Sequence, residues 1–138
     1  MDWLSIAETI AARLRETAVA REHAAVPPLL EISWLRDADL LTLLNPAQAG
    51  GGAAAFSDAF RVVRRLARAD TSIAQLLSYH YLLSHSAFWR ATEEQRSRLV
   101  RQSVEQKWLG RPWRLRPSTA RFVTSPRIGY ASRPRSGN

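Results

Sequence analysis

The sequence predicts an all-α body followed by an irregular C-terminal tail. Through most of residues 1–110, apolar side chains recur at the 3.6-residue spacing of amphipathic helices. Beyond residue 110 this periodicity stops, and four of the seven prolines lie there. At 138 residues the chain has the size of one domain. We therefore expect a helical domain at residues 1–110 and an Arg/Pro-rich tail at residues 111–138.

A first helix is expected from about Trp3 to Ala25. Its apolar side chains fall on one face: Trp3, Ile6, Ala7, Ile10 and Leu14. Ser5 and Glu8 have the spacing of a capping box near its start. Pro27-Pro28 then ends the helix, because a residue before proline avoids the helical region.

A shorter helix, from Leu29 to about Leu41, leads into a leucine-rich run and the glycine loop Gly50–Gly52. Asp37 and Asp39 have no histidine near them in the sequence, so we interpret them as a solvated turn rather than an acid/base pair. The glycines lack the GxGxxG and GxxxxGK[ST] patterns of phosphate-binding loops. We therefore expect a tight turn that lets helices pack closely, rather than a phosphate cradle.

Three more helices follow. The third, Ala53 to Ala69, carries an apolar stripe of Phe56, Phe60, Val63 and Leu66 or Ala67. Asp70-Thr71-Ser72 can cap the fourth, Ser72 to about Ala91, which is apolar almost all round. Such a helix is typically buried in a core or between subunits. The fifth opens with the capping-box spacing Thr92–Gln95, runs to about Gln106, and is followed by a glycine stop at Gly110.

Several classes of site and location are disfavoured by composition. His80 and His85 are five residues apart with no adjacent carboxylate, so we expect no zinc or other metal site. The chain has no cysteine, which excludes disulfides and thiolate chemistry. No apolar run approaches the roughly 20 residues of a membrane span, and the N-terminus lacks the features of a signal peptide. We therefore expect a cytoplasmic protein with no membrane partner.

The net charge of +8 belongs to the tail. From Gly110 onward there are seven arginines and no acidic residue, which leaves 13 basic and 12 acidic residues in the body. A basic tail can bind phosphate backbones, but this one has no lysine and no helical periodicity. We do not expect a nucleic-acid partner. A small helical binding module, using this tail on an anionic partner or on nucleic acid, is the alternative function.

Four short motifs together resemble, in order and spacing, the N-terminal helical domain of the acyl-CoA dehydrogenase superfamily. They are Leu40-Leu41 through Pro46-x-x-x-Gly50-Gly51, Ala69-Asp70-Thr71-Ser72-Ile73-Ala74, Thr92-Glu93-Glu94-Gln95-Arg96 and Lys107-Trp108-Leu109-Gly110. Within the superfamily, Tyr79-His80-Tyr81-Leu82 resembles the flavin-dependent monooxygenase branch, which includes dibenzothiophene-monooxygenase-like and sulfur-acquisition enzymes.

This resemblance implies a flavin-dependent oxidoreductase that uses FAD or FMN. It also implies that His80 is catalytic and that Tyr81 and Ser84 bind substrate. An imidazole on a buried, aromatic-rich helix can donate a hydrogen bond to a reacting oxygen. A histidine that only satisfies its hydrogen bonds in the core is the other interpretation of His80.

The sequence also departs from the family pattern. Ala49 stands where the family usually has an aromatic residue, and Arg111-Pro112-Trp113-Arg114 replaces a small-residue stretch. Phe122–Pro126 resembles the first strand of the family's β domain, but the rest of that domain and the C-terminal helical bundle are missing. Those parts supply most flavin contacts in the family. We therefore expect a truncated N-terminal portion that is inactive and retains no flavin alone, unless a β-domain partner chain or a homo-oligomer completes it.

Overall fold

The computed structural model describes residues 1–107, and this part is helical without a strand. Its elements are α1 (Trp3–Ala24), α2 (Leu29–Asp37), the 3₁₀ turns η1 (Leu40–Thr42) and η2 (Ala47–Ala49), α3 (Phe56–Ala67), α4 (Thr71–Arg90) and α5 (Glu93–Gln106). The all-α prediction is confirmed for these residues. The predicted glycine stop, the strand candidate at residues 120–124 and the whole tail lie outside them.

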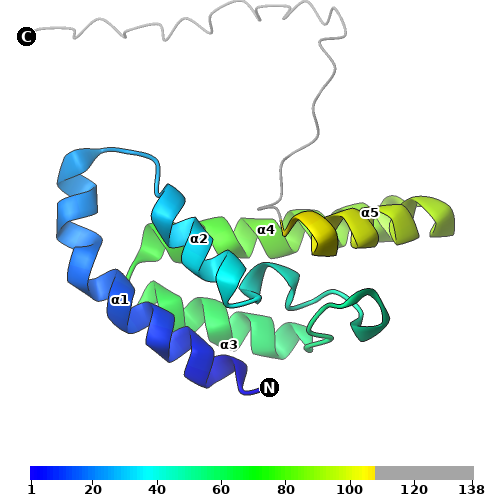
Figure 1. The fold of residues 1–138 in the computed structure, drawn as a ribbon, viewed down its shortest axis with the longest axis horizontal. Coiled ribbons are helices and arrows are strands. Elements are labelled where there is room, and N and C mark those ends of the chain that lie inside the picture. The colour runs from blue at the N-terminus through cyan, green and yellow to red at the C-terminus, as the bar shows by residue number, and fades with distance from the viewer. Residues whose placement is uncertain (108–138) are drawn as a thin grey trace, which may run out of the picture.

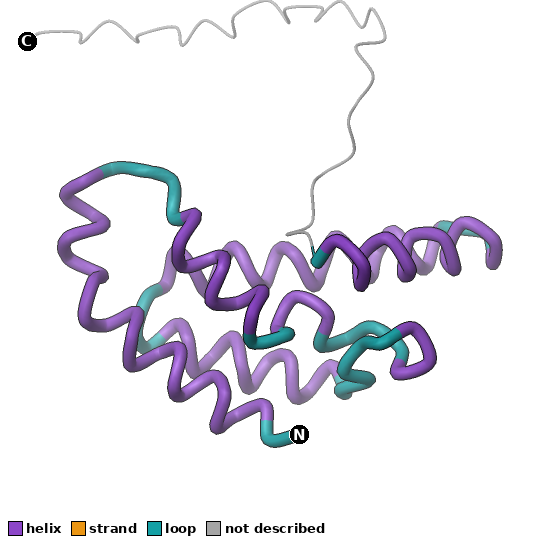
Figure 2. The backbone as a smooth tube through the Cα atoms, in the orientation of Figure 1, coloured by secondary structure: helices purple, strands orange, loops and turns teal. Residues whose placement is uncertain are grey.

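Helix α3 forms the centre of the arrangement, with α1 packed on one side and α4 on the other (Figure 1). Helix α2 contacts α1 and η1, while α5 packs against α4 and η2. Figure 2 shows the long connection between α2 and α3 as loop interrupted by the two short helical turns. Among the helices of residues 1–107, none is both long enough and apolar enough to span a membrane.

The core lies where α1, α3 and α4 meet the η1 turn. Its fully buried large side chains are Leu14, Leu35, Leu40, Leu43, Val62, Leu66, Ile73 and Leu77. The predicted apolar face of α1 is confirmed, because Ala7, Ile10 and Leu14 are buried and Trp3 and Ile6 are half-buried against the same cluster.

The predicted stripe on α3 is right only in part, since Leu66 is buried and Val63 and Ala67 pack against the core. The buried residues of this helix are Ala59, Val62 and Leu66, whereas the Phe60 side chain is 63% exposed. Apolar residues occupy two neighbouring faces of α3, and the helix turns the face with small Ala59 toward its neighbours. A small side chain permits close helix approach, which a phenylalanine would prevent.

The helix boundaries follow their caps. Asp2 caps α1 by accepting hydrogen bonds from the Leu4 and Ser5 amides at 3.1 and 3.2 Å, so the predicted Ser5–Glu8 capping box is wrong. The Thr92 capping box of α5 is confirmed, with reciprocal bonds of 3.0 and 3.3 Å to Gln95. Helix α2 ends at Asp37, four residues earlier than predicted, because Asp39 adopts a left-handed conformation with φ 58°.

Candidate functional site

His80 and Tyr81 lie in the core and hold the η1 turn against α4. The Tyr81 hydroxyl donates a 2.7 Å hydrogen bond to the carbonyl of Leu40, and His80 Nε2 lies 2.6 Å from the carbonyl of Leu41. His80 is 3% exposed and Tyr81 4%. Consecutive side chains of one helix therefore bind consecutive carbonyls of one turn, which ties two segments about 40 residues apart in sequence.

The electrostatics of this pair favour neutral side chains. Burial lowers the pKa of His80, and the Leu41 carbonyl opposes that shift only in part. Burial raises the pKa of Tyr81. Because a carbonyl oxygen can only accept, the proton of the neutral imidazole sits on Nε2. The nitrogen that could donate to a reacting oxygen is thus already engaged with Leu41, so a catalytic His80 would have to act through Nδ1.

Ser84 lies one helical turn beyond His80, on the same face of α4. Its Oγ is buried and has no hydrogen-bond partner within residues 1–107. A buried hydroxyl without a partner costs about 1–3 kcal/mol, so such an atom calls for an explanation. Of the three predicted site residues, Ser84 is the one whose polar atom stays unsatisfied in the described part of the chain.

The outer face of α4 is apolar and exposed in the single chain, so of the two settings expected for this helix the domain core covers only its inner side. Tyr79, Leu82, Leu83 and Trp89 are 53%, 56%, 39% and 76% exposed. At one edge of this face His85 stacks edge-on against Trp89, with ring centroids 5.6 Å apart. Exposed apolar surface of this extent is typical of an interaction site. We call these four residues the α4 outer face.

The glycine loop has no backbone donors to offer a phosphate. The amides of residues 50–54 all bond to carbonyls of residues 42–47, at 2.8 to 3.1 Å. A Cβ on Gly51 would lie 2.4 Å from the Asn45 carbonyl oxygen, so the two backbone stretches are in direct contact. Gly50, at φ 85°, makes the turn itself. The prediction of a tight turn is confirmed. The glycines also let helices approach the loop, because a Cβ on Gly52 would lie 2.6 Å from the Trp3 ring of α1 and one on Gly50 would lie 3.2 Å from Val104 of α5.

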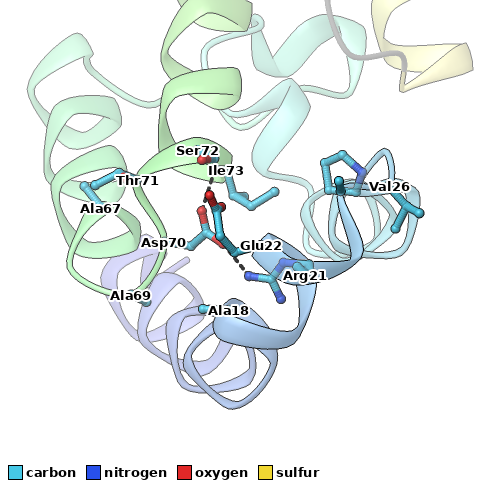
Figure 3. A pocket seen from close by; sticks show the side chains of 12 residues that line it. Ala18, Arg21, Glu22, Val26, Ala67, Ala69, Asp70, Thr71, Ser72 and Ile73 are labelled. Atoms are coloured by element: carbon cyan, nitrogen blue, oxygen red, sulfur yellow. Dashed lines mark hydrogen bonds and ion pairs between the residues drawn. The ribbon is translucent and has the colours of Figure 1, made fainter.

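A charge cluster that the sequence did not reveal joins three helices. Arg21 of α1 forms ion pairs with Asp70, at the start of α4, and with Glu31 of α2, the latter at 3.3 Å. Figure 3 shows the guanidinium reaching across to Asp70 beside a cleft of about 510 Å³. Their side chains are only 7–14% exposed. Nothing in the spacing of these residues indicates that they meet, because they come from three separate segments.

Asp70 is a structural carboxylate. Burial alone would raise its pKa, but the hydrogen bond from the Ile73 amide, at 3.0 Å, and the contact with Arg21 outweigh that effect and lower it. A carboxylate with a lowered pKa is a poor proton acceptor at neutral pH. Asp70 therefore caps α4, as predicted, and neutralises Arg21.

The remaining carboxylates show no metal chemistry. Within residues 1–107, no three histidine, aspartate or glutamate side chains gather as metal ligands would. Asp37 is exposed, in line with the predicted solvated turn, whereas Asp39 forms a 2.7 Å ion pair with Lys107.

Known proteins place the chain in a family. A sequence profile of the acyl-CoA dehydrogenase N-terminal domain matches residues 5–107. The chain belongs to the acyl-CoA dehydrogenase family. Among its curated relatives, the probable FMNH2-dependent monooxygenase SfnC of Pseudomonas putida is 34% identical over 105 residues, 76% of this chain and 27% of SfnC. Dibenzothiophene monooxygenase of Rhodococcus erythropolis is 34% identical over 107 residues, 78% of this chain and 26% of that enzyme.

Solved structures agree with this acyl-CoA dehydrogenase assignment. The dibenzothiophene monooxygenase TdsC of Paenibacillus sp. A11-2 superposes with a TM-score of 0.76 at 29% identity, covering 79% of this chain and 28% of TdsC. The methanesulfinate monooxygenase MsuC of Pseudomonas fluorescens gives the same TM-score at 33% identity, covering 79% of this chain and 28% of MsuC. TdsC has also been solved with FMN and indole. The predicted resemblance to the flavin-dependent monooxygenase branch is confirmed.

This acyl-CoA dehydrogenase domain spans about a quarter of the relatives it matches. Several polar groups suggested by the sequence for a flavin or phosphate site are already engaged within the described residues. The amides of the glycine loop are consumed internally, and His80 Nε2 and the Tyr81 hydroxyl turn inward to η1. Ser84 Oγ is a single hydroxyl and does not by itself bind a flavin.

Proposed function

We propose that this chain is the N-terminal portion of a flavin-dependent monooxygenase of the acyl-CoA dehydrogenase type. The observation that carries the proposal is the match over residues 5–107, with 34% identity both to an FMNH2-dependent enzyme and to dibenzothiophene monooxygenases. FMN is the favoured flavin, because SfnC is described as FMNH2-dependent and TdsC has been solved with FMN. The substrate class of the relatives suggests a small sulfur-containing or aromatic compound.

The chain alone should be inactive, because it spans about a quarter of its relatives and the amides of its glycine loop are already bonded internally. The direct test is to purify the 138-residue chain, add FMN and measure the flavin that remains after gel filtration. We expect less than a tenth of an equivalent, and no oxygenation of dibenzothiophene or methanesulfinate with reduced FMN. Stoichiometric flavin retention would contradict the proposal.

We further propose that the missing parts of the enzyme, as a partner chain, cover the α4 outer face. Leu82 and Trp89 are more than half exposed there, and nearly three quarters of the length of SfnC lies outside the part that this chain matches. Burying such side chains contributes about 1.5–3 kcal/mol each. A partner that supplies this burial would therefore hold the assembly together.

Co-expression with the remaining part of a relative tests whether a partner chain binds this one and completes the enzyme. The chain is co-expressed with the C-terminal three quarters of SfnC, and co-purification and flavin content are measured. Leu82→Ser with Trp89→Ser should abolish co-purification while the isolated chain keeps its thermal midpoint, since both side chains are exposed. Val19→Ser, on α1 and 71% exposed, is the matched control and should have no effect. If the control and the double variant behave alike, the α4 outer face is not the interface.

His80, Tyr81 and Ser84 stay proposed site residues, with roles that the complemented enzyme can separate. His80→Gln keeps a donor near Leu41, so it preserves the core bond while it removes the imidazole. If His80 is catalytic through Nδ1, this variant loses turnover at least tenfold with little change in thermal midpoint. Normal turnover per folded molecule would leave His80 a core residue. Ser84→Ala should raise KM more than it lowers kcat if Ser84 Oγ binds substrate.

A further inference from the structure

Four arginines of α3 and its C-cap line one hollow. They are Arg61, Arg64, Arg65 and Arg68, and Leu4 of α1 completes the lining of a space of about 260 Å³. Their spacing of three, four and seven residues brings successive side chains onto one face of a helix. Sequence periodicity showed arginines between the apolar positions of this segment, but not that they share a concavity.

The hollow has more positive charge than its neighbours neutralise. Arg65 pairs with Glu8 at 2.9 Å, and Arg61 pairs with Asp58 at 3.5 Å. For Arg64 and Arg68, no carboxylate of residues 1–107 lies within ion-pair distance. Like charges at helical spacing destabilise one another, so two unmatched guanidinium groups in one hollow favour an anion between them.

The helix dipole explains only in part why arginines gather at the C-terminal end of α3. Cations near a helix C-terminus are favourable, and Arg64 and Arg65 stand in the last turn of α3 with Arg68 at its C-cap. That effect accounts for basic side chains at this end of the helix. It does not require all four arginines to converge on one hollow, and it does not reach Arg61, nearly two turns from the end.

Size and donor geometry point to the kind of anion. A hollow of about 260 Å³ is far above the roughly 10–15 Å³ that one water molecule needs on the same measure, so it has room for a tetrahedral oxyanion with some hydration. Guanidinium groups present a planar fork of N–H donors that matches two oxygens of such an anion. Asp58 and Glu8 flank the hollow, and their charges would repel an extended polyanion that continued past it.

We propose that this hollow is a binding site for a single tetrahedral oxyanion of the phosphate or sulfate class. Arg64 and Arg68 hold the anion, and Arg61 and Arg65 stay with their carboxylates and complete the wall of the hollow. The site lies on α3, whereas His80 and Ser84 lie on α4, so the proposal does not depend on the flavin chemistry.

The test titrates inorganic phosphate, and separately sulfate, into the full 138-residue chain at constant ionic strength. Sodium chloride balances the ionic strength, and binding is followed by the thermal midpoint and by the NMR signals of the arginine Nε–H groups. We expect saturable binding in the millimolar range, with shifts concentrated in the arginines of α3. Arg64→Gln with Arg68→Gln should weaken binding at least tenfold.

The control removes the same charge elsewhere. Arg90→Gln with Arg98→Gln, two exposed arginines of α4 and α5, should leave the affinity within twofold. Arg64→Lys with Arg68→Lys keeps the charge but not the fork, and should weaken binding several-fold even if the glutamine pair folds poorly. The proposal is overturned if phosphate raises the thermal midpoint and shifts the arginine signals no more than chloride does. It is overturned as well if the Arg90 and Arg98 control weakens phosphate binding as much as the Arg64 and Arg68 pair does. It is also overturned if a single-stranded oligonucleotide binds the same arginines more tightly per phosphate than free phosphate does.

Discussion

Replacement of Arg21 by methionine should destabilise the helical body more than any surface charge change. The guanidinium is 14% exposed and contacts two carboxylates, those of Asp70 and Glu31. It also donates to the Leu14 carbonyl at 3.3 Å and to the Thr17 hydroxyl. Methionine fills a similar volume but donates nothing, so two nearly buried carboxylates from different helices are left without their cation.

The magnitude follows from burial. Removing one member of a buried, hydrogen-bonded ion pair costs about 3–5 kcal/mol. The side chains of Asp70 and Glu31 retain 11% and 7% exposure, so we expect the lower end, about 3 kcal/mol. The matched control is Arg15→Met, also on α1, whose pair with Glu8 is 3.6 Å long and about half exposed. An exposed pair of that kind contributes about 0–1 kcal/mol.

Urea unfolding of the 138-residue chain, followed by far-UV circular dichroism at pH 7, measures both variants. With slopes of about 1–3 kcal/mol per molar urea, the Arg21 variant should unfold at a midpoint lower by roughly 1–3 M. The Arg15 variant should shift it little. A loss at Arg21 no larger than that at Arg15 would refute the inference that the cluster joins three helices.

The pH dependence gives a second check on the same cluster. The folded state lowers the pKa of Asp70, so its contribution is fully present above the unfolded value of about 3.9 and is lost as pH falls through the folded value. The stability difference between the wild-type chain and Arg21→Met should therefore be constant near neutral pH and shrink below about pH 4. A difference that stays unchanged at pH 3 would contradict this account.

Three other substitutions test the core contacts. His80→Gln should reduce the loss of stability between pH 7 and pH 5, because burial lowers the pKa of His80 in the folded state and its contribution is lost as pH falls. An unchanged loss in this variant would contradict the buried, neutral imidazole. Tyr81→Phe should cost about 1–2 kcal/mol in urea unfolding, because it leaves the Leu40 carbonyl without its donor. Gly51→Ala should destabilise the fold by at least about 1–3 kcal/mol in the same assay, because its methyl group would overlap the Asn45 backbone. Unchanged stability in Tyr81→Phe or in Gly51→Ala would contradict the corresponding contact.

The sequence predicted the helices well and their packing less well. Five helical segments, the break at Pro27-Pro28 and the caps at Asp70 and Thr92 follow from local rules, because a helix and its cap involve residues a few positions apart. The end of α2 was placed four residues too late although Asp37 and Asp39 were interpreted as a turn, because aspartate adopts the left-handed conformation of Asp39 only in a minority of cases. The buried face of α3 was placed only in part, because two apolar faces were available and only the neighbouring helices select one.

The candidate site shows the same division. The family motif located His80, Tyr81 and Ser84 on one buried helix, and all three do lie on α4. Local pattern could not tell that the first two bind carbonyls of η1 some 40 residues away, while Ser84 Oγ has no partner within residues 1–107. A hydrogen-bond partner is a property of three-dimensional contact, and no spacing along one helix contains it.

The sequence by itself determined the all-α class, the family and the near-neutral charge of the body, since these depend on periodicity, short motifs and composition. Only the tertiary structure decided which charges meet. Arg21 joins Asp70 and Glu31, and the arginines of α3 converge on one hollow, because packing brings separate helices within a few ångströms of one another. Electrostatic energies depend on those distances and on burial, and neither is encoded in the spacing of residues along the chain.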